Sequence, residues 1–102
     1  MSAATLSRVA ELADLFRMLG DPTRLRILLA CAEAPVAVSD IADKLDVSSS
    51  LVSHHLRLLR AARMVRGERR GKQVFYTAAD QHVSRVLADL LEHLTESPAD
   101  GD

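Results

Sequence analysis

The fold is decided by residues 39–60, which read SDIADKLDVSSSLVSHHLRLLR. Ser39 stands before a short amphipathic run over 40–45, and Ser48 stands before a longer run over 49–62. A serine hydroxyl in this place accepts a hydrogen bond from the backbone of the first helical turn, so each serine predicts a helix start. A short helix, a tight turn and a longer helix together form a helix-turn-helix pattern, although this turn contains no glycine.

The longer helix presents short hydroxyls and basic side chains on the side away from its apolar residues Leu51, Val52, Leu56 and Leu59. Short hydroxyls let a helix approach the major groove closely, and residues near the start of such a helix usually touch base edges. The ordinary alternatives are capping or solvent exposure for the serines and a plain surface position for the histidines. The candidates for DNA contact on this helix are Ser49, Ser50, Ser53, His54, Arg57 and Arg60, with His55 as a further one.

The next segment carries β-forming residues on both sides of two glycines. Met64 to Arg66 and Gln73 to Thr77 are the β-forming stretches, and Gly67 to Gly71 between them allows a turn. The pattern predicts a β-hairpin with a basic tip that reaches flanking phosphates or the minor groove. The tip residues are Arg69, Arg70 and Lys72.

The net charge of −1 conceals a basic band. Between Arg57 and Lys72 stand seven basic residues and one acid, Glu68, whereas from Gln73 onward there are six acids and one base, Arg85. A charge run is usually a solvated surface. Here the run coincides with the helix-turn-helix pattern, and a basic face on a neutral domain suits an anionic polymer such as double-stranded DNA.

Upstream of this region the sequence predicts two further helices. The first runs from about Thr5 to Leu19 and ends at Gly20. Asp21 then caps the second helix, and Pro22 occupies its first position, where a missing N–H has no consequence. This second helix stops before Pro35.

The C-terminal part of the sequence predicts one amphipathic helix from about Asp80 to Thr95. Its apolar residues recur at intervals of three and four, which gives a continuous stripe suited to packing against another helix. The stripe consists of Val83, Val86, Leu87, Leu90, Leu91 and Leu94.

Four residues at the two ends of this helix, Asp80, His82, His93 and Glu96, are of types that bind zinc. Three of them lie on one side of the helix, but His82 and His93 stand about 16 Å apart along it. Zinc requires donors about 2 Å from its centre, so one helix cannot supply a complete site. Two antiparallel copies can, with Asp80 and His82 from one chain and His93 and Glu96 from the other. The plainer alternative is that Asp80 is only an N-cap and the histidines are surface residues.

The donor set indicates which metal would bind. Two imidazoles and two carboxylates suit tetrahedral zinc, and Co(II) fits the same arrangement. Nickel prefers more ligands, and the sequence offers no obvious fifth or sixth. The expected order is therefore Zn(II), then Co(II), then Ni(II).

The composition bounds the remaining possibilities. A chain of 102 residues supports one domain over 1–102, with an ordered core of about 5–96 and a flexible tail at 97–102. No signal peptide or membrane-spanning run is present, and the single cysteine, Cys31, is consistent with a reducing cytoplasm and a small buried side chain. No nucleophile, phosphate loop or acid pair points to an enzyme, and a zinc site filled by four protein ligands leaves no position for substrate.

Four motifs, in this order, resemble the ArsR/SmtB family of bacterial metal-sensing repressors. They are Asp21 to Leu28, Val38 to Ala42, Leu51 to Arg60 and Gly71 to Tyr76. The resemblance spans about Thr5 to Glu96 and implies a mainly α winged helix-turn-helix homodimer with a β-hairpin wing. It places the first and last helices at the dimer interface. It also implies repression of metal-efflux or resistance genes, with metal releasing the protein from operator DNA.

The resemblance also bears on the metal site. Some members bind soft metals through cysteines where this chain has Ala37 and Ser39, so that site is absent. Others use an Asp-x-His pair and a His-x-x-Glu pair in the last helix, and the zinc-sensing SmtB pattern matches the four residues above. By resemblance, the second ring nitrogen of His93 contacts backbone near Arg63. Two alternatives remain open: a winged-helix repressor without metal control, and a helical dimerisation module without a DNA target.

Overall fold

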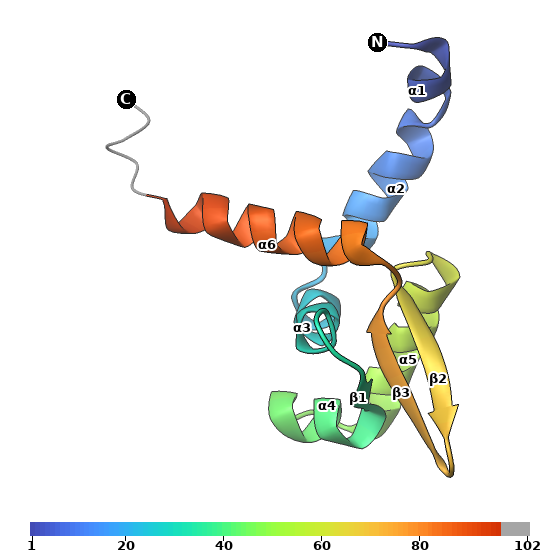
Figure 1. The fold of residues 1–102 in the computed structure, drawn as a ribbon, viewed down its shortest axis with the longest axis vertical. Helices are drawn as coiled ribbons and strands as arrows, with labels where there is room; N and C mark the ends of the chain where they lie inside the picture. The colour runs from blue at the N-terminus through green and yellow to red at the C-terminus, as the bar shows by residue number, and fades with distance from the viewer. Residues whose placement is uncertain (97–102) are drawn as a thin grey trace.

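The computed structural model describes residues 1–96, so the tail expected at 97–102 lies outside the described residues. The architecture is mainly α with a small antiparallel sheet, as the sequence predicts (Figure 1). The strands lie in the order β1-β3-β2, with α4 and α5 on one side of the hairpin. The elements in chain order are α1 (Ala3–Ser7), α2 (Val9–Leu19), α3 (Pro22–Ala30), β1 (Val36–Ala37), α4 (Val38–Leu45), α5 (Ser49–Ala61), β2 (Val65–Arg70), β3 (Gln73–Ala78) and α6 (Gln81–Thr95).

The helix-turn-helix forms from α4 and α5. Asp46 ends α4 in the left-handed conformation, with φ 56° and ψ 50°, and thus does what a glycine would do in this turn. Ser48 caps α5 by accepting a hydrogen bond from the Leu51 N–H at 3.1 Å, which confirms that prediction. Ser39 does not cap α4, because the helix begins at Val38, two residues before the predicted start at Asp40. The preceding residue, Ala37, is held extended by its pairing with strand β3.

The wing is a hairpin with a tighter turn than the glycine pattern indicates. β2 and β3 pair until Arg70 faces Gln73, so the turn is the two-residue Gly71-Lys72, with Gly71 at φ +63°. Gly67 lies inside β2 instead. A Cβ there would stand 3.1 Å from the Tyr76 ring, so the glycine allows that ring to pack across the strands. Strand β1 adds a third, unpredicted member by pairing with β3.

The N-terminal region forms two helices where the sequence predicts one. The break is at Arg8, which closes α1 and opens α2. The Ser7 hydroxyl donates to the Ala4 carbonyl at 2.8 Å, a local bond that competes with helix continuation and bends the chain. The second predicted start is confirmed, since the Asp21 carboxylate accepts from the Arg24 N–H at 2.8 Å and Pro22 is the first residue of α3.

One buried cluster holds α3, α4, α5 and the base of the wing together. Its fully buried side chains include Ile27, Leu28, Ile41, Val52, Leu56 and Leu59, and Cys31 is fully buried beside them. Burial raises the pKa of the Cys31 thiol to about 11, so the residue behaves as a small hydrophobe. No helix within residues 1–96 is both long and apolar enough to cross a membrane.

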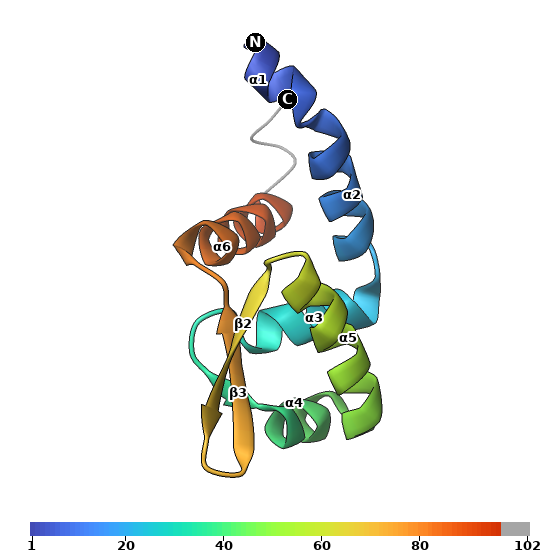
Figure 2. The same ribbon diagram turned by 90° about the vertical axis from the view of Figure 1, so that its right-hand side faces the viewer.

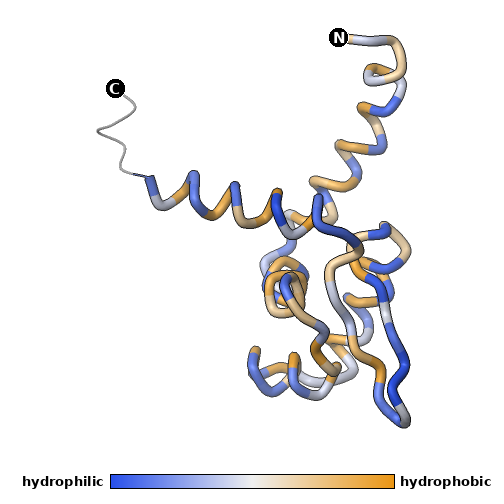
Figure 3. The backbone as a smooth tube through the Cα atoms, in the orientation of Figure 1, coloured by the Kyte–Doolittle hydropathy of each residue, from blue (hydrophilic) through white to orange (hydrophobic). Residues whose placement is uncertain are grey.

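The terminal helices α1, α2 and α6 extend away from this cluster (Figures 1 and 2). The radius of gyration is 15.5 Å, above the roughly 13 Å of a compact domain of this length. Only Val83 and Leu87 of α6 are buried, and no residue of α1 or α2 is. Hydrophobic residues recur along both arms (Figure 3), and among them the side chains of Leu12, Phe16, Leu90 and Leu94 are exposed.

Candidate nucleic-acid interface and metal-ligating helix

Helix α5 presents most of the predicted DNA contacts on its outer side. Its inner side is fixed in the core by Val52, Leu56 and Leu59, so the helix cannot rotate about its own axis. The side chains left outside are Ser49, Ser50, His54, Arg57 and Arg60, which are exposed, and Ser53, which is half-buried. Leu51, predicted as part of the apolar face, is instead 38% exposed. The arrangement supplies hydroxyls at the helix start and guanidinium groups further along, as groove binding requires.

His55 does not belong to this outer surface. It is 9% exposed, and its Nδ1 accepts a hydrogen bond from Arg24 Nε at 3.3 Å, while Arg24 Nη1 donates to the Met18 carbonyl. Burial, followed by the neighbouring Arg24 charge, lowers the pKa of His55. The residue therefore fastens α5 to α3. Its spacing from Val52 and Leu59, three and four residues, is the sequence signal that could have placed it inside.

The wing tip carries Arg69, Arg70 and Lys72, all exposed. The two arginines lie on opposite strand faces, and Arg69 shares its face with the buried Val65. Arg70 is restrained, because its guanidinium lies 3.3 Å from Glu68 Oε2 and 4.8 Å from the centre of the Phe75 ring. Sequence reasoning found the basic tip but not this restraint.

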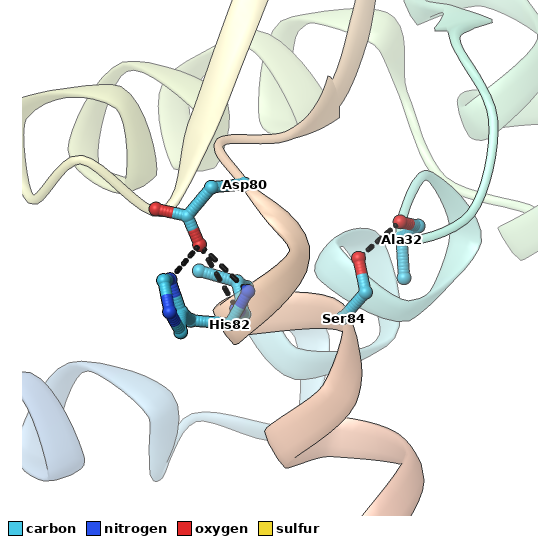
Figure 4. A network of polar contacts seen from close by, with 5 residues as sticks. Ala32, Asp80, His82 and Ser84 are labelled. Carbon is cyan, nitrogen blue, oxygen red and sulfur yellow. Dashed lines mark hydrogen bonds and ion pairs between the residues drawn. The ribbon is translucent and has the colours of Figure 1, made fainter.

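Asp80 and His82 come together at the start of α6. Asp80 Oδ1 accepts from the backbone N–H groups of His82 at 2.9 Å and Val83 at 3.2 Å, so the aspartate is the N-cap of the helix. His82 Nδ1 lies 3.4 Å from the same oxygen (Figure 4). The two side chains are 56% and 84% exposed respectively. Both are therefore open to a ligand from outside the chain.

The separation of this pair can be compared with the geometry of a metal site. Two donors that each lie about 2 Å from a tetrahedral ion stand about 3.3 Å apart. The observed 3.4 Å matches that spacing. The separation fits a pair of metal ligands, and it equally fits the ordinary contact of a cap carboxylate with a neighbouring imidazole, because the same oxygen accepts both N–H groups of the cap.

His93 and Glu96 occupy the other end of α6, and both are exposed. At the helical rise they stand about 16 Å or more from the first pair. Within residues 1–96 no group of three His, Cys, Asp or Glu side chains lies close enough to hold one metal ion. Within the described residues one chain therefore brings together two of the four predicted ligands at most, and the metal-site assignment stays a prediction.

Two helices expose apolar faces beside these predicted ligands. On α2 the exposed residues include Leu12 at 53% and Phe16 at 59%, and on α6 they include Leu90 at 49% and Leu94 at 78%. Several large apolar side chains lined up on a helix in water mark an interaction surface.

The fold and the basic wing beside α5 together define a winged helix-turn-helix DNA-binding protein. Residues 21–66 match the family described as bacterial regulatory protein, arsR family. The transcriptional repressor SmtB homolog of Synechocystis is 41% identical over 93 residues, which span 91% of this chain and 70% of that protein. The repressor SmtB of Mycobacterium tuberculosis H37Rv is 40% identical over 83 residues, or 81% of this chain and 62% of that one.

Solved structures show the same fold. Reduced HlyU from Vibrio cholerae N16961 superposes with a TM-score of 0.79 at 25% identity, covering 94% of this chain and all of that one. The homodimeric winged helix-turn-helix domain of Mb0332 from Mycobacterium bovis gives 0.81 at 25% identity, covering 96% and 94%. The chain belongs to the ArsR family and is a DNA-binding transcriptional repressor, not an enzyme.

Proposed function

We propose that this chain is a homodimeric, metal-responsive repressor that leaves double-stranded operator DNA when Zn(II), or alternatively Co(II), binds between its subunits. The observation that carries the proposal is the Asp80–His82 pair, exposed at 3.4 Å on a helix whose far end carries His93 and Glu96. The regulated genes would be those for metal efflux or resistance. Ni(II) ranks third because the donor set lacks further ligands.

The dimer follows from the exposed apolar faces. Within residues 1–96 no segment covers Val86, Leu90 and Leu94 on α6 or Leu12 and Phe16 on α2. Packing two copies antiparallel through α6 removes these faces from water and brings opposite helix ends together. We propose one domain over 1–102 in each subunit and a cytoplasmic location.

The DNA contacts divide into two groups. Ser49, Ser50, Ser53 and His54 at the start of α5 are proposed to read base edges in the major groove. Phosphates and the flanking minor groove would be contacted by Arg57, Arg60, Arg69, Arg70 and Lys72.

The proposed metal site joins half-sites from two chains. Zinc supplies four-coordinate bonding, and the residues that would hold it are Asp80 and His82 with the partner's His93 and the partner's Glu96. With these side chains drawn together, the two α6 helices are locked in one relative position. The reading helices of a dimer must face half-sites about 34 Å apart, so a small rotation of each subunit weakens DNA binding.

A link from this site to α5 comes from the family resemblance. His93 would use its second ring nitrogen to contact backbone near Arg63, which closes α5 in a left-handed conformation with φ 61°. An outer hydrogen bond of this kind fixes the orientation of a metal-bound imidazole. Metal and DNA must then oppose each other by the same factor, because coupling between two binding sites is reciprocal.

The test is operator binding by fluorescence anisotropy, using DNA from upstream of the chain's own gene, with and without stoichiometric zinc. The parent should lose affinity with zinc and His93→Ala should not. Glu92→Ala removes an exposed neighbouring acid outside the proposed set and should respond like the parent. Equal parent affinity in both conditions would leave a winged-helix repressor without metal control.

A further inference from the structure

We propose that Ser84 is the positioning residue that couples the metal-binding end of α6 to the reading unit, which consists of α3, α4, α5 and the wing. The inference rests on the proposed function, because it concerns how the Asp80–His82 half-site acts on α5. It assigns a role to a side chain that is neither a metal ligand nor a DNA contact.

The observation is one hydrogen bond. Ser84 Oγ donates to the Ala32 carbonyl at 2.8 Å, in a half-buried position at the base of α6 (Figure 4). Within residues 1–96, only this bond and that between Arg24 and His55 join a side chain to a residue distant in sequence. In the same part of the chain it is the only hydrogen bond that connects α6 to another element.

The other attachments of α6 are apolar. Val83 and Leu87 are 8% and 6% exposed and join the core cluster. Apolar contacts are non-directional and tolerate sliding, whereas a hydrogen bond weakens steeply when its angle or length changes. The Ser84 hydroxyl therefore fixes the rotation and register of α6, and a movement of the helix start is transmitted at this point.

The acceptor lies at the end of α3, the helix that supports α5. Ala32 follows Cys31, the C-cap of α3, whose carbonyl accepts from the Ala78 N–H at 3.1 Å. From there α3 reaches α5 through Ile27 and Leu28 in the shared core, and through the Arg24–His55 bond at its other end. A displacement of Ala32 would therefore shift α3, and α3 would in turn shift α5 through these contacts.

Ser84 is also close to the proposed ligands. Its own N–H bonds to the Asp80 carbonyl at 3.5 Å, so it lies in the first turn of the helix that Asp80 caps. When Asp80 and His82 are drawn toward a metal ion, this turn moves first. Ser84 is the residue in that turn whose side chain is bonded to the reading unit.

The test compares three variants with the parent. Ser84→Ala removes the bond, and Ser84→Thr retains a hydroxyl. Thr95→Ala is the matched control, since its Oγ1 donates at the same 2.8 Å to Glu92 within α6 and reaches no other element. For each protein, operator affinity is measured with and without zinc, and zinc affinity with and without operator. The ratio in either pair is the coupling factor.

In Ser84→Ala the coupling factor should fall by about threefold to tenfold, the effect expected for the loss of one hydrogen bond. Zinc affinity without DNA should remain within about twofold of the parent value, and Ser84→Thr and Thr95→Ala should keep the parent coupling. An unchanged coupling factor in Ser84→Ala would overturn the inference alone. A parent that shows no zinc effect on operator binding would overturn the proposed function with it.

If Ser84→Ala does not fold, hydrogen exchange on the parent decides the question. Zinc should then change the protection of backbone amides over residues 24–32, which cover most of α3 and the two residues that follow it. Protection changes confined to α6 would overturn the proposal.

Discussion

Two parts of the molecule differ in how much of their apolar surface is buried within one chain. The reading unit, defined as α3, α4, α5 and the wing, buries its apolar side chains within one chain, with Ile27, Leu56 and Leu59 at 0–1% exposure. The terminal arms, α1, α2 and α6, leave many of theirs exposed, with Phe16 and Leu94 at 59% and 78%. The reading unit is therefore packed within one chain, whereas we propose that the arms and the two ligand pairs on α6 are completed by a second copy.

The largest predicted effects are a loss of stability for a substitution in the reading unit and a loss of dimerisation for a substitution on α6. Leu56→Ala opens a cavity in the reading unit and should lower the free energy of unfolding by about 2–5 kcal/mol. Leu90→Glu places a charge on the exposed face of α6, so it should leave the reading unit folded while the dimer dissociates. Urea unfolding and sedimentation velocity measure the two effects. A monomeric parent, or a Leu90→Glu dimer as tight as the parent, contradicts the comparison.

Two substitutions of Asp80 can distinguish its role as the N-cap of α6 from its proposed role as a metal ligand. Asp80→Ala loses both roles and should lower stability by about 1 kcal/mol. Asp80→Ser keeps an N-cap oxygen but lacks a carboxylate, so its stability should stay near the parent value. Zinc affinity should fall in both variants, by more than the roughly 10- to 100-fold associated with outer-shell losses. Retained zinc affinity in Asp80→Ser would show that the aspartate serves only as a cap.

His55 should make the reading unit sensitive to acid. Burial lowers its folded-state pKa below the unfolded value of 6.5, with Arg24 adding to the effect, so folding favours the neutral ring. The contribution of His55 is complete above pH 6.5 and declines as the pH falls from there toward the folded pKa. Denaturant unfolding from about pH 7.5 to about pH 5.5 measures this loss. His55→Gln retains an acceptor for Arg24 and should show a flatter profile; an equally steep one would assign the loss to other groups.

The smallest effect concerns the wing. Each lost phosphate contact lowers the salt slope of DNA binding by about 1. Arg69→Ala should show that loss, and Arg70→Ala should show less, because Arg70 is held by Glu68 and Phe75. Affinity titrations across salt concentrations provide the slopes. A larger loss for Arg70 would mean that its restraint presents the guanidinium to DNA.

The sequence predicts the elements that local signals define. The caps Asp21 and Ser48 each determine a helix start through their own side chains, and the structure confirms both. Asp80, which the sequence offers as an N-cap in the alternative to a ligand role, caps α6 as well. The Asp80–His82 pair is close because Asp80 lies outside the helix as its N-cap, and its carboxylate folds back over the first turn that carries His82. The ligand and DNA-contact assignments themselves stay predictions.

The features that the sequence does not reveal depend on distant partners. Strand β1 exists only because Val36 meets Tyr76, and α4 starts early because Ala37 is held in that pairing. The Ser84 bond to Ala32 spans 52 residues. No local pattern marks such contacts. His55 lies between these two cases. Its spacing from Val52 and Leu59 indicates a buried position, whereas a histidine is more often found at the surface.

In the proposed dimer each metal site is shared between two chains, so mixing two variants that each lack one half of the ligands is the first experiment to make. Asp80→Ala/His82→Ala and His93→Ala/Glu96→Ala each destroy both sites in their own homodimers. A mixed dimer restores one complete site, formed by the intact half of each chain. Co(II) titration, followed by the absorption bands of a tetrahedral ion, should therefore show weak binding to either variant alone and tight binding after mixing and subunit exchange. Mixed dimers that bind Co(II) no better than the separate variants would contradict the account.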